Sequence, residues 1–145
     1  MIAAFYGRVP FKMYILSKPA KYGIKLFMVN DAASQYCINA IPYLGMGSTP
    51  ALGDGINQGE YFTMKLIQDS DLLAEGRVVI MDNWFTSLHL VETLKAHNMH
   101  VVDTIRMNKA QVPSKALIKG LKLPKGDTVA FHNRDRKMTL AVKKV

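Results

Sequence analysis

The chain has 145 residues, of which 49% are hydrophobic and 21% are charged. This length fits one ordinary domain with a real core, and the composition excludes disordered and fibrous proteins, which are poor in apolar residues or strictly repetitive. The 19 Lys and Arg residues outnumber the 11 Asp and Glu residues, so the net charge is +8, which favours a polyanionic partner such as DNA, RNA or an acidic membrane surface.

The first half of the chain predicts a hairpin followed by a helix. Tyr22–Asp31 is rich in aromatic and β-prone residues, which is typical of a strand. Gln35–Gly45 predicts a second strand, and Pro42 indicates an edge or a strand end because proline donates no hydrogen bond to a ladder. The glycine-rich stretch Gly45–Gly59 predicts a loop. Over Glu60–Leu73 apolar residues recur near helical spacing, which predicts a helix that ends before the next glycine.

The second half predicts a strand, a helix and a further strand. Arg77–Met81 (RVVIM) is short and apolar, which is typical of a strand buried on both faces. Thr86 or Ser87 can cap a following helix, and His100–Arg106 predicts the next strand. The buried stripe of that helix is expected to consist of leucine and valine residues, namely Leu88, Leu90, Val91 and Leu94.

The end of the chain predicts a loop and a hairpin. Lys115–Lys125 is basic and loop-like, whereas Thr128–His132 and Met138–Lys143 have strand-like patterns that can pair. The full order of elements is therefore β-β-α-β-α-β followed by a hairpin. This order predicts the α/β class, with helices packed on a mixed sheet.

The charges are segregated along the chain. Residues 1–25 hold five bases and no acid, residues 26–105 hold three bases and nine acids, and residues 106–145 hold eleven bases and two acids. An acidic middle between basic ends suits a protein that grips a polyanion and keeps carboxylates free for another task. The alternative for any single lysine is an ordinary solvated surface position.

Asp82 is the residue whose position indicates chemistry. It follows a strand expected to be buried, and open α/β sheets place ligand and catalytic groups at the carboxyl ends of such strands. A carboxylate there can bind Mg²⁺, which prefers oxygen ligands. Spacing alone leaves a structural role equally open, in which Asp82 ends the strand or helps to cap the next helix. The histidines and Cys37 show no zinc-ligand spacing, and the glycines show no phosphate-binding order.

Four segments, in chain order, resemble piggyBac-type transposases. The most specific is Asp82–Ser87 (DNWFTS), which is similar to the family signature D-N-[FW]-[FY]-[TS]-S. Gly7–Lys25 (GRVPFKMYILSKPAKYGIK) resembles the family block GR-x-PF[RK]-x-YI-x-x-KP-x-K[YW]GIK. Ile41–Gly45 (IPYLG) and Thr104–Lys109 (TIRMNK), with a proline following the latter, are similar to two further segments.

The resemblance implies an RNase H-like core of the DDE/D kind. Such cores hold two divalent ions, Mg²⁺ or Mn²⁺, with three acidic residues, and they catalyse the in-line attack of water or a 3′-hydroxyl on a phosphodiester. The second acid of the family falls on Asp82, as both catalytic residue and metal ligand. The predicted order fits this core with its first strand largely missing. We therefore assign residues 1–113 to a partial RNase H-like transposase core and residues 114–145 to a basic linker and hairpin that continue the transposase domain.

The sequence departs from the family pattern in three respects. The first catalytic Asp of the family precedes the segment that corresponds to Met1, and the third lies in a late segment not found here, so we expect the chain to be inactive alone. A missing first strand would leave edges of Tyr22–Asp31 and Arg77–Met81 unpaired, so we expect marginal stability or dependence on a partner. Asp103 stands where the family usually has Gly, and the sequence assigns it no role.

Two functions from different classes fit the sequence. The first is a fragment of a piggyBac-like DNA transposase, and the alternative is a domesticated, non-catalytic nucleic-acid-binding protein. A third hypothesis is that the open reading frame is decayed or truncated and has no cellular role. In both of the first two, DNA is the expected partner, with a homodimer as a further expectation. The side chains expected to contact phosphates are Arg8, Lys12, Lys18, Lys21, Lys25, Arg106 and Lys109. For Trp84, Phe85 and Tyr14, packing in the core is expected over stacking on an unpaired base.

The expected location is the nucleus, as the family implies. The single cysteine, Cys37, cannot form an internal disulfide, which indicates a reducing compartment. No apolar run approaches the length of a membrane span, and Met1–Phe11 lacks the layout of a signal peptide. Neither a membrane partner nor a small-molecule substrate is therefore expected.

Overall fold

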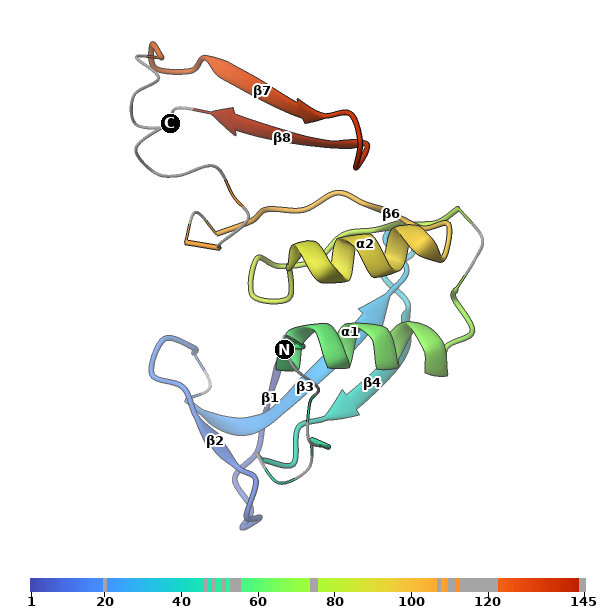
Figure 1. The fold of residues 1–145 in the computed structure, drawn as a ribbon. Helices are drawn as coiled ribbons and strands as arrows, with labels where there is room; N and C mark the ends of the chain where they lie inside the picture. Colours follow the sequence, from blue (N-terminus) through green and yellow to red (C-terminus); the bar gives the residue numbers. More distant parts are fainter. Residues whose placement is uncertain are drawn as a thin grey trace. The chain divides into compact units, whose positions relative to one another are not determined.

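The structure is a computed structural model that describes residues 1–19, 21–45, 47, 49–50, 52, 56–73, 76–106, 108–109, 112 and 123–143. The chain divides into two compact units, Met1–Ile105 and Arg106–Val145, each of which is described by itself (Figure 1). Within the described residues, no helix is long and apolar enough to cross a membrane. The fold belongs to the mixed α/β class, with two helices and several small sheets.

The first unit begins with a four-stranded antiparallel sheet. Its strands are β1 (Ile2–Ala4), β2 (Met13–Tyr14), β3 (Tyr22–Asn30) and β4 (Cys37–Pro42). The long strand β3 is central, because each of the other three pairs with it. The β3–β4 ladder runs from Leu26 opposite Pro42 to Asn30 opposite Cys37, so the predicted hairpin is confirmed.

The predicted unpaired edge along β3 is wrong for the first half of that strand. β1 pairs with β3 from Ala4 opposite Gly23 to Ile2 opposite Lys25, and the Leu26 N–H donates to the Met1 carbonyl at 2.9 Å. The approach is close because Gly23 has no side chain: a Cβ there would lie 2.2 Å from the Ala3 carbonyl oxygen. Since β1 and β2 span only three and two residues, they carry no periodic pattern that a sequence reading can detect.

Two capped helices follow the sheet. α1 (Gln58–Asp69) is capped by Asn57, whose side chain accepts a hydrogen bond from the Glu60 N–H at 2.9 Å. α2 (Leu88–Ala96) is capped by Ser87, whose hydroxyl accepts a hydrogen bond from the Leu90 N–H at 3.0 Å. Both predicted helices are confirmed, and Ser87 is the capping residue of the two candidates.

A short parallel pair of strands lies next to these helices. β5 (Val78–Val79) pairs with β6 (His100–Val101), with Val78 opposite His100 and Val79 opposite Val101. The prediction that Arg77–Met81 is buried on both faces is wrong, because Val78 is 57% exposed and Ile80 is 69% exposed. Only alternate residues of this segment, Val79 and Met81, pack on the apolar cluster below α2, so the described elements cover one face of it.

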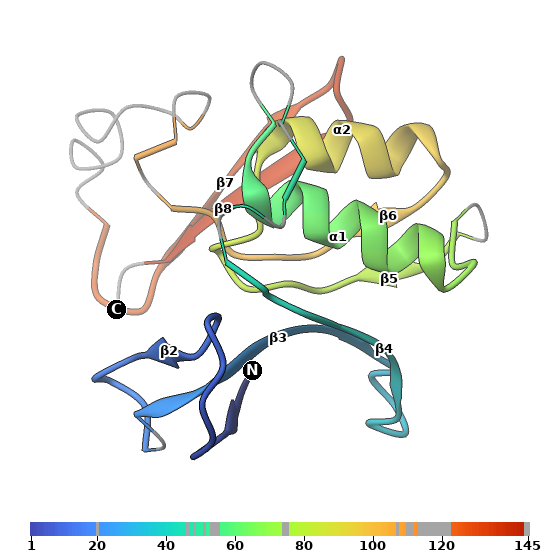
Figure 2. The ribbon, with the colours of Figure 1, turned by 90° about the horizontal axis from the view of Figure 1, so that it is seen from below.

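The single mixed sheet expected from the sequence is divided into separate sheets. In the part of the chain that the structure describes, the β5–β6 pair shares no ladder with the four-stranded sheet. α1 lies between α2 and the β3–β4 hairpin in both views (Figures 1 and 2). It contributes to two apolar clusters, one formed by Phe27, Tyr43, Phe62 and Leu66 and the other by Ile67, Leu90, Leu94 and Met99. Packing on α1 therefore joins the four-stranded sheet to the β5–β6 pair, which share no ladder.

The second unit contains a hairpin. β7 (Thr128–Asn133) and β8 (Met138–Lys143) pair antiparallel over their whole lengths, which confirms the predicted hairpin almost residue for residue. The Asn133 side chain accepts from the Arg136 N–H at 3.0 Å across the turn. The basic segment predicted over residues 115–125 lies largely outside the described residues.

Candidate functional site

The segment Asp82–Ser87 forms a turn between β5 and α2. Phe85 N–H donates to the Asp82 carbonyl at 2.8 Å, which reverses the chain directly after the strand. Asp82 is exposed, and no hydrogen bond or ion pair to another described residue engages its carboxylate. Because β5 and β6 are parallel, Asp82 lies at the sheet edge where both strands end. Ser87 caps α2, so the capping role left open for Asp82 is wrong.

Asp103 lies at the same edge of the parallel pair. It follows β6, and its carboxylate is engaged at both oxygens: Oδ2 accepts from the hydroxyl of Thr86, and Oδ1 accepts from the Thr104 N–H at 2.6 Å. Thr86 is only 4% exposed, and its Oγ1 also lies 3.3 Å from the Asp82 carbonyl oxygen. The carboxylates of the two acids that follow the parallel strands therefore differ in their surroundings. That of Asp103 accepts hydrogen bonds from the protein, whereas that of Asp82 is exposed to solvent.

Aromatic side chains support the turn from inside the unit. The Trp84 ring stacks on Phe27 with centroids 5.7 Å apart, and the Phe85 ring meets Phe27 edge-on at 5.9 Å. Phe27 is 2% exposed and stacks on Phe62 of α1 at 4.0 Å. Trp84 and Phe85 thus anchor the turn in the core, as the sequence indicated. The expected core packing of Tyr14 is wrong, because Tyr14 is 53% exposed and its ring pairs with that of Tyr22, with centroids 4.8 Å apart.

Lys25 lies among these rings. Its Nζ is 4.3 Å from the centroid of Trp84, 4.5 Å from that of Phe27 and 5.3 Å from that of Tyr43. Burial lowers the pKa of Lys25, while the electron-rich ring faces stabilise the ammonium that burial disfavours. Lys25 therefore contacts the turn that carries Asp82, which no pattern in the sequence indicated.

The first turn of α1 fits closely against the backbone of the Asp82 turn. A Cβ at Gly59 would lie 3.0 Å from Phe85 Cα and 3.1 Å from the Trp84 carbonyl oxygen. Such distances are shorter than ordinary van der Waals contact with backbone, which cannot move aside as a flexible side chain can. A glycine in a helix normally lowers its stability, and here it permits the helix to approach the turn.

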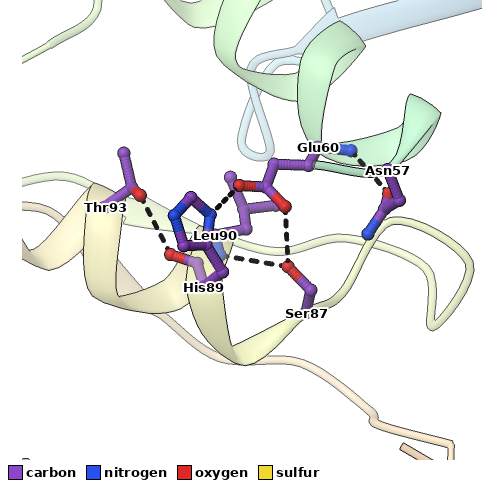
Figure 3. A network of polar contacts seen from close by, with 6 residues as sticks. All are labelled: Asn57, Glu60, Ser87, His89, Leu90 and Thr93. Carbon is purple, nitrogen blue, oxygen red and sulfur yellow. Dashed lines mark hydrogen bonds and ion pairs between the residues drawn. The ribbon is translucent and has the colours of Figure 1, made fainter. Parts of the chain in front are cut away.

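A polar network joins α1 to α2 beside this contact (Figure 3). The Glu60 side chain is 4% exposed, and its Oε2 accepts from the Ser87 hydroxyl at 3.1 Å while its Oε1 contacts Nδ1 of His89. Ser87 Oγ in turn accepts from the Leu90 N–H, so one hydroxyl serves both the cap and the network. The Asp82 turn is consequently held at its helical end by a buried carboxylate of the neighbouring helix.

Comparisons with known proteins bear on the whole chain. A family model described as Transposase IS4 matches residues 1–144. A solved cryo-EM structure of the piggyBac transposase synaptic complex with hairpin DNA matches with a TM-score of 0.79 and 36% sequence identity. This chain belongs to the piggyBac-type transposase family. The match covers 92% of this chain and 27% of the piggyBac transposase chain, so the present chain spans little more than a quarter of that length.

The basic residues predicted to bind DNA fall in both units of this piggyBac-type chain. Arg8, Lys18 and Lys21 are exposed in the loops that flank β2. Lys12 donates to the Gly7 carbonyl at 3.0 Å, and its Nζ lies 5.6 Å from the centroid of the Tyr22 ring. The predicted residues of the second unit are an exposed arginine and a half-buried lysine, Arg106 and Lys109.

The divalent metal implied by the piggyBac-type family is not accommodated by the described residues alone. Among them, no group of three or more His, Cys, Asp or Glu side chains could hold an ion. Asp82 offers one exposed carboxylate, which is a suitable hard ligand, but both oxygens of Asp103 already accept hydrogen bonds. A single carboxylate binds Mg²⁺ weakly and cannot position two ions, because Mg²⁺ gives up its waters reluctantly.

Replacing Gly59 by alanine is expected to lower the free energy of unfolding by about 1–2 kcal/mol, despite the higher helix propensity of alanine. The new methyl group would press on the backbone of Trp84 and Phe85 and displace the Asp82 turn. Urea titration followed by Trp84 emission measures the change. Gly76→Ala is a poor control because Gly76 has a φ of 64°, so Gln68→Ala on the exposed face of α1 serves instead. Unchanged stability in Gly59→Ala would contradict the close fit.

Proposed function

We propose that this chain is part of a metal-dependent DNA transposase in which Asp82 is a catalytic acid and a metal ligand. The observation that carries the proposal is the position of Asp82. Its carboxylate is exposed beyond the carboxyl end of the parallel strand β5, in the DNWFTS turn of a piggyBac-type chain. Sheet edges of this kind are where open α/β folds assemble ligand and catalytic groups.

An RNase H-like core is part of the same proposal. It is supported by an antiparallel hairpin, β3–β4, which is followed by α1 and then by the parallel unit β5–α2–β6. The relevant ions are Mg²⁺ and Mn²⁺, which in such enzymes activate the attacking oxygen and stabilise the leaving one. Of the two acids that follow β5 and β6, Asp82 alone has a carboxylate with no hydrogen bond to another described residue, so we propose that the chain alone is inactive in DNA cleavage.

DNA is the proposed partner. The similar piggyBac transposase was solved in a synaptic complex with hairpin DNA, and the present chain carries a net charge of +8. The exposed Arg8, Lys18, Lys21 and Arg106 would contact phosphates, together with the half-buried Lys12, Lys25 and Lys109. Action as a homodimer and location in the nucleus complete the proposal. The second candidate is a non-catalytic DNA-binding protein. It is supported by the same basic residues and assigns no role to Asp82.

The dependence of DNA binding on salt concentration should reveal the phosphate contacts. Binding of a terminal-repeat duplex, followed by fluorescence anisotropy, is expected to weaken steeply between about 50 and about 200 mM salt. Changing Arg8, Lys18 and Lys21 together to Gln should reduce the slope of log affinity against log salt by about 0.9 for each lost contact. Lys65→Gln is the control, because Lys65 pairs with Asp69 at 2.8 Å in the acidic middle of the chain. An unchanged slope in the triple variant would count against DNA contact through these residues.

The catalytic proposal is tested with an extended protein. If the genomic sequence continues the reading frame with an Asp-Glu pair upstream and a further Asp downstream, the extended protein should cleave the duplex in Mg²⁺. Asp82→Asn should then abolish cleavage and leave duplex binding intact. The present chain should bind without cleaving. Cleavage by the extended protein that survives Asp82→Asn would overturn the catalytic assignment and favour the non-catalytic alternative for this segment.

A further inference from the structure

We propose that Asp103 is a positioning residue, which holds the turn that carries Asp82 in place through the hydroxyl of Thr86. The proposal rests on the proposed function only in naming Asp82 as the group that is positioned. Asp103 follows β6 and Thr86 lies in the turn after β5, so the contact joins the two parallel strands beyond their last ladder bond. That bond runs from the Val102 N–H to the Val79 carbonyl at 3.1 Å.

The chemistry of Thr86 explains why the contact fixes the turn. A hydroxyl donates one proton, and two acceptors lie within its reach, the Asp103 carboxylate and the Asp82 carbonyl at 3.3 Å. A hydrogen bond to a carboxylate is the stronger of the two because it is charge-assisted. Thr86 is 4% exposed, so water cannot readily replace its partner.

Asp103 is itself held in position. Its second oxygen, Oδ1, accepts from the Thr104 N–H at 2.6 Å, so the carboxylate is bonded on both sides and cannot rotate freely toward solvent. The carboxylate of Asp82 has no such engagement with another described residue. The two acids at this edge therefore have different roles: Asp82 is exposed and available to react, and Asp103 holds the backbone of the turn that carries Asp82.

Trp84 provides a direct readout of this fastening. It is the single tryptophan of the chain, it lies in the same turn, and its ring packs on Phe27 and Lys25. Asp103→Ala and Thr86→Val are each expected to shift the Trp84 emission to longer wavelength and to increase its quenching by acrylamide. The double variant should show no larger change than either single variant, because each single variant already removes the hydrogen bond that the two side chains share. Thr86→Ser, which keeps the hydroxyl, should retain the emission of the original protein.

Matched controls separate positioning from loss of folding. Asp69→Asn removes an exposed carboxylate of α1 and should leave the Trp84 emission unchanged. Asp103→Asn keeps an acceptor of the same shape, so it should fall between the original protein and Asp103→Ala, with unchanged far-ultraviolet circular dichroism. Additive effects of Asp103→Ala and Thr86→Val, or no change of Trp84 emission in either, would overturn the proposal.

The same variants separate this inference from the proposed function. In an extended protein that cleaves DNA, Asp103→Asn and Thr86→Val should both lower kcat with little change in KM. If Asp103 were instead a metal ligand, Asp103→Asn would weaken Mn²⁺ binding while Thr86→Val had no effect, and positioning would be refuted. If Trp84 reports the coupling but Asp82→Asn leaves cleavage intact, the fastening of the turn stands and the catalytic role of Asp82 fails.

Discussion

Replacing Phe27 with alanine is expected to lower the free energy of unfolding of the first unit by about 3–5 kcal/mol. Phe27 is 2% exposed at the centre of β3, and its ring centroid lies 4.0 Å from that of Phe62 and 5.7 Å from that of Trp84. Alanine would leave a cavity between the sheet, α1 and the turn that carries Asp82. Because whole domains are stable by only about 5–15 kcal/mol, this single change should bring the unit close to unfolding at room temperature.

Urea denaturation followed by circular dichroism and Trp84 emission measures the effect of Phe27→Ala. Tyr36→Ala is the matched control, since Tyr36 is an aromatic residue of the same sheet region that is 70% exposed, and it should change stability by less than about 0.5 kcal/mol. A loss in Phe27→Ala no larger than that of the control would mean that the aromatic cluster does not support the fold.

The sequence predicted the long periodic elements well. The strand over 22–31, the helix that begins near Glu60 and the terminal hairpin all appear, because each has enough residues for its period to be visible. β1 and β2 were missed because pairing with β3, rather than local pattern, makes them strands. The apolar composition of the segment around Val78 and Ile80 indicated a fully buried strand, but composition cannot tell how many faces the neighbouring elements cover.

The site was predictable only in part, and for a similar reason. Asp82 was identified because the end of an apolar strand and the DNWFTS motif are both local features of the sequence. Asn57 followed by Glu60 is also a local signal, the start of a capped helix, and Asn57 does cap α1. That signal places the Glu60 carboxylate back on its own helix, whereas the structure turns it toward Ser87 and His89 of α2. Contacts between elements, including that of Asp103, have no such local signature.

Replacing Glu60 with alanine is therefore expected to be the most damaging change at the site, lowering the free energy of unfolding by about 2–3 kcal/mol. The carboxylate is almost fully buried, and its removal leaves the Ser87 hydroxyl without an acceptor between two helices. His89 is 60% exposed and can turn to water, so His89→Ala should cost far less. Glu60→Gln keeps the size and one acceptor and should lie between the two.

The effect of Glu60→Ala should extend beyond stability to the turn that precedes α2. Ser87 both caps α2 and ends the Asp82 turn, so loss of its partner on α1 frees the point at which the turn joins the helix. Trp84 quenching by acrylamide should accordingly rise in Glu60→Ala and remain unchanged in Gln68→Ala on the exposed face of α1. If Glu60→Ala instead matches Gln68→Ala in both unfolding free energy and quenching, the buried carboxylate does not join the helices, and the close approach of α1 at Gly59 must hold the turn by packing alone.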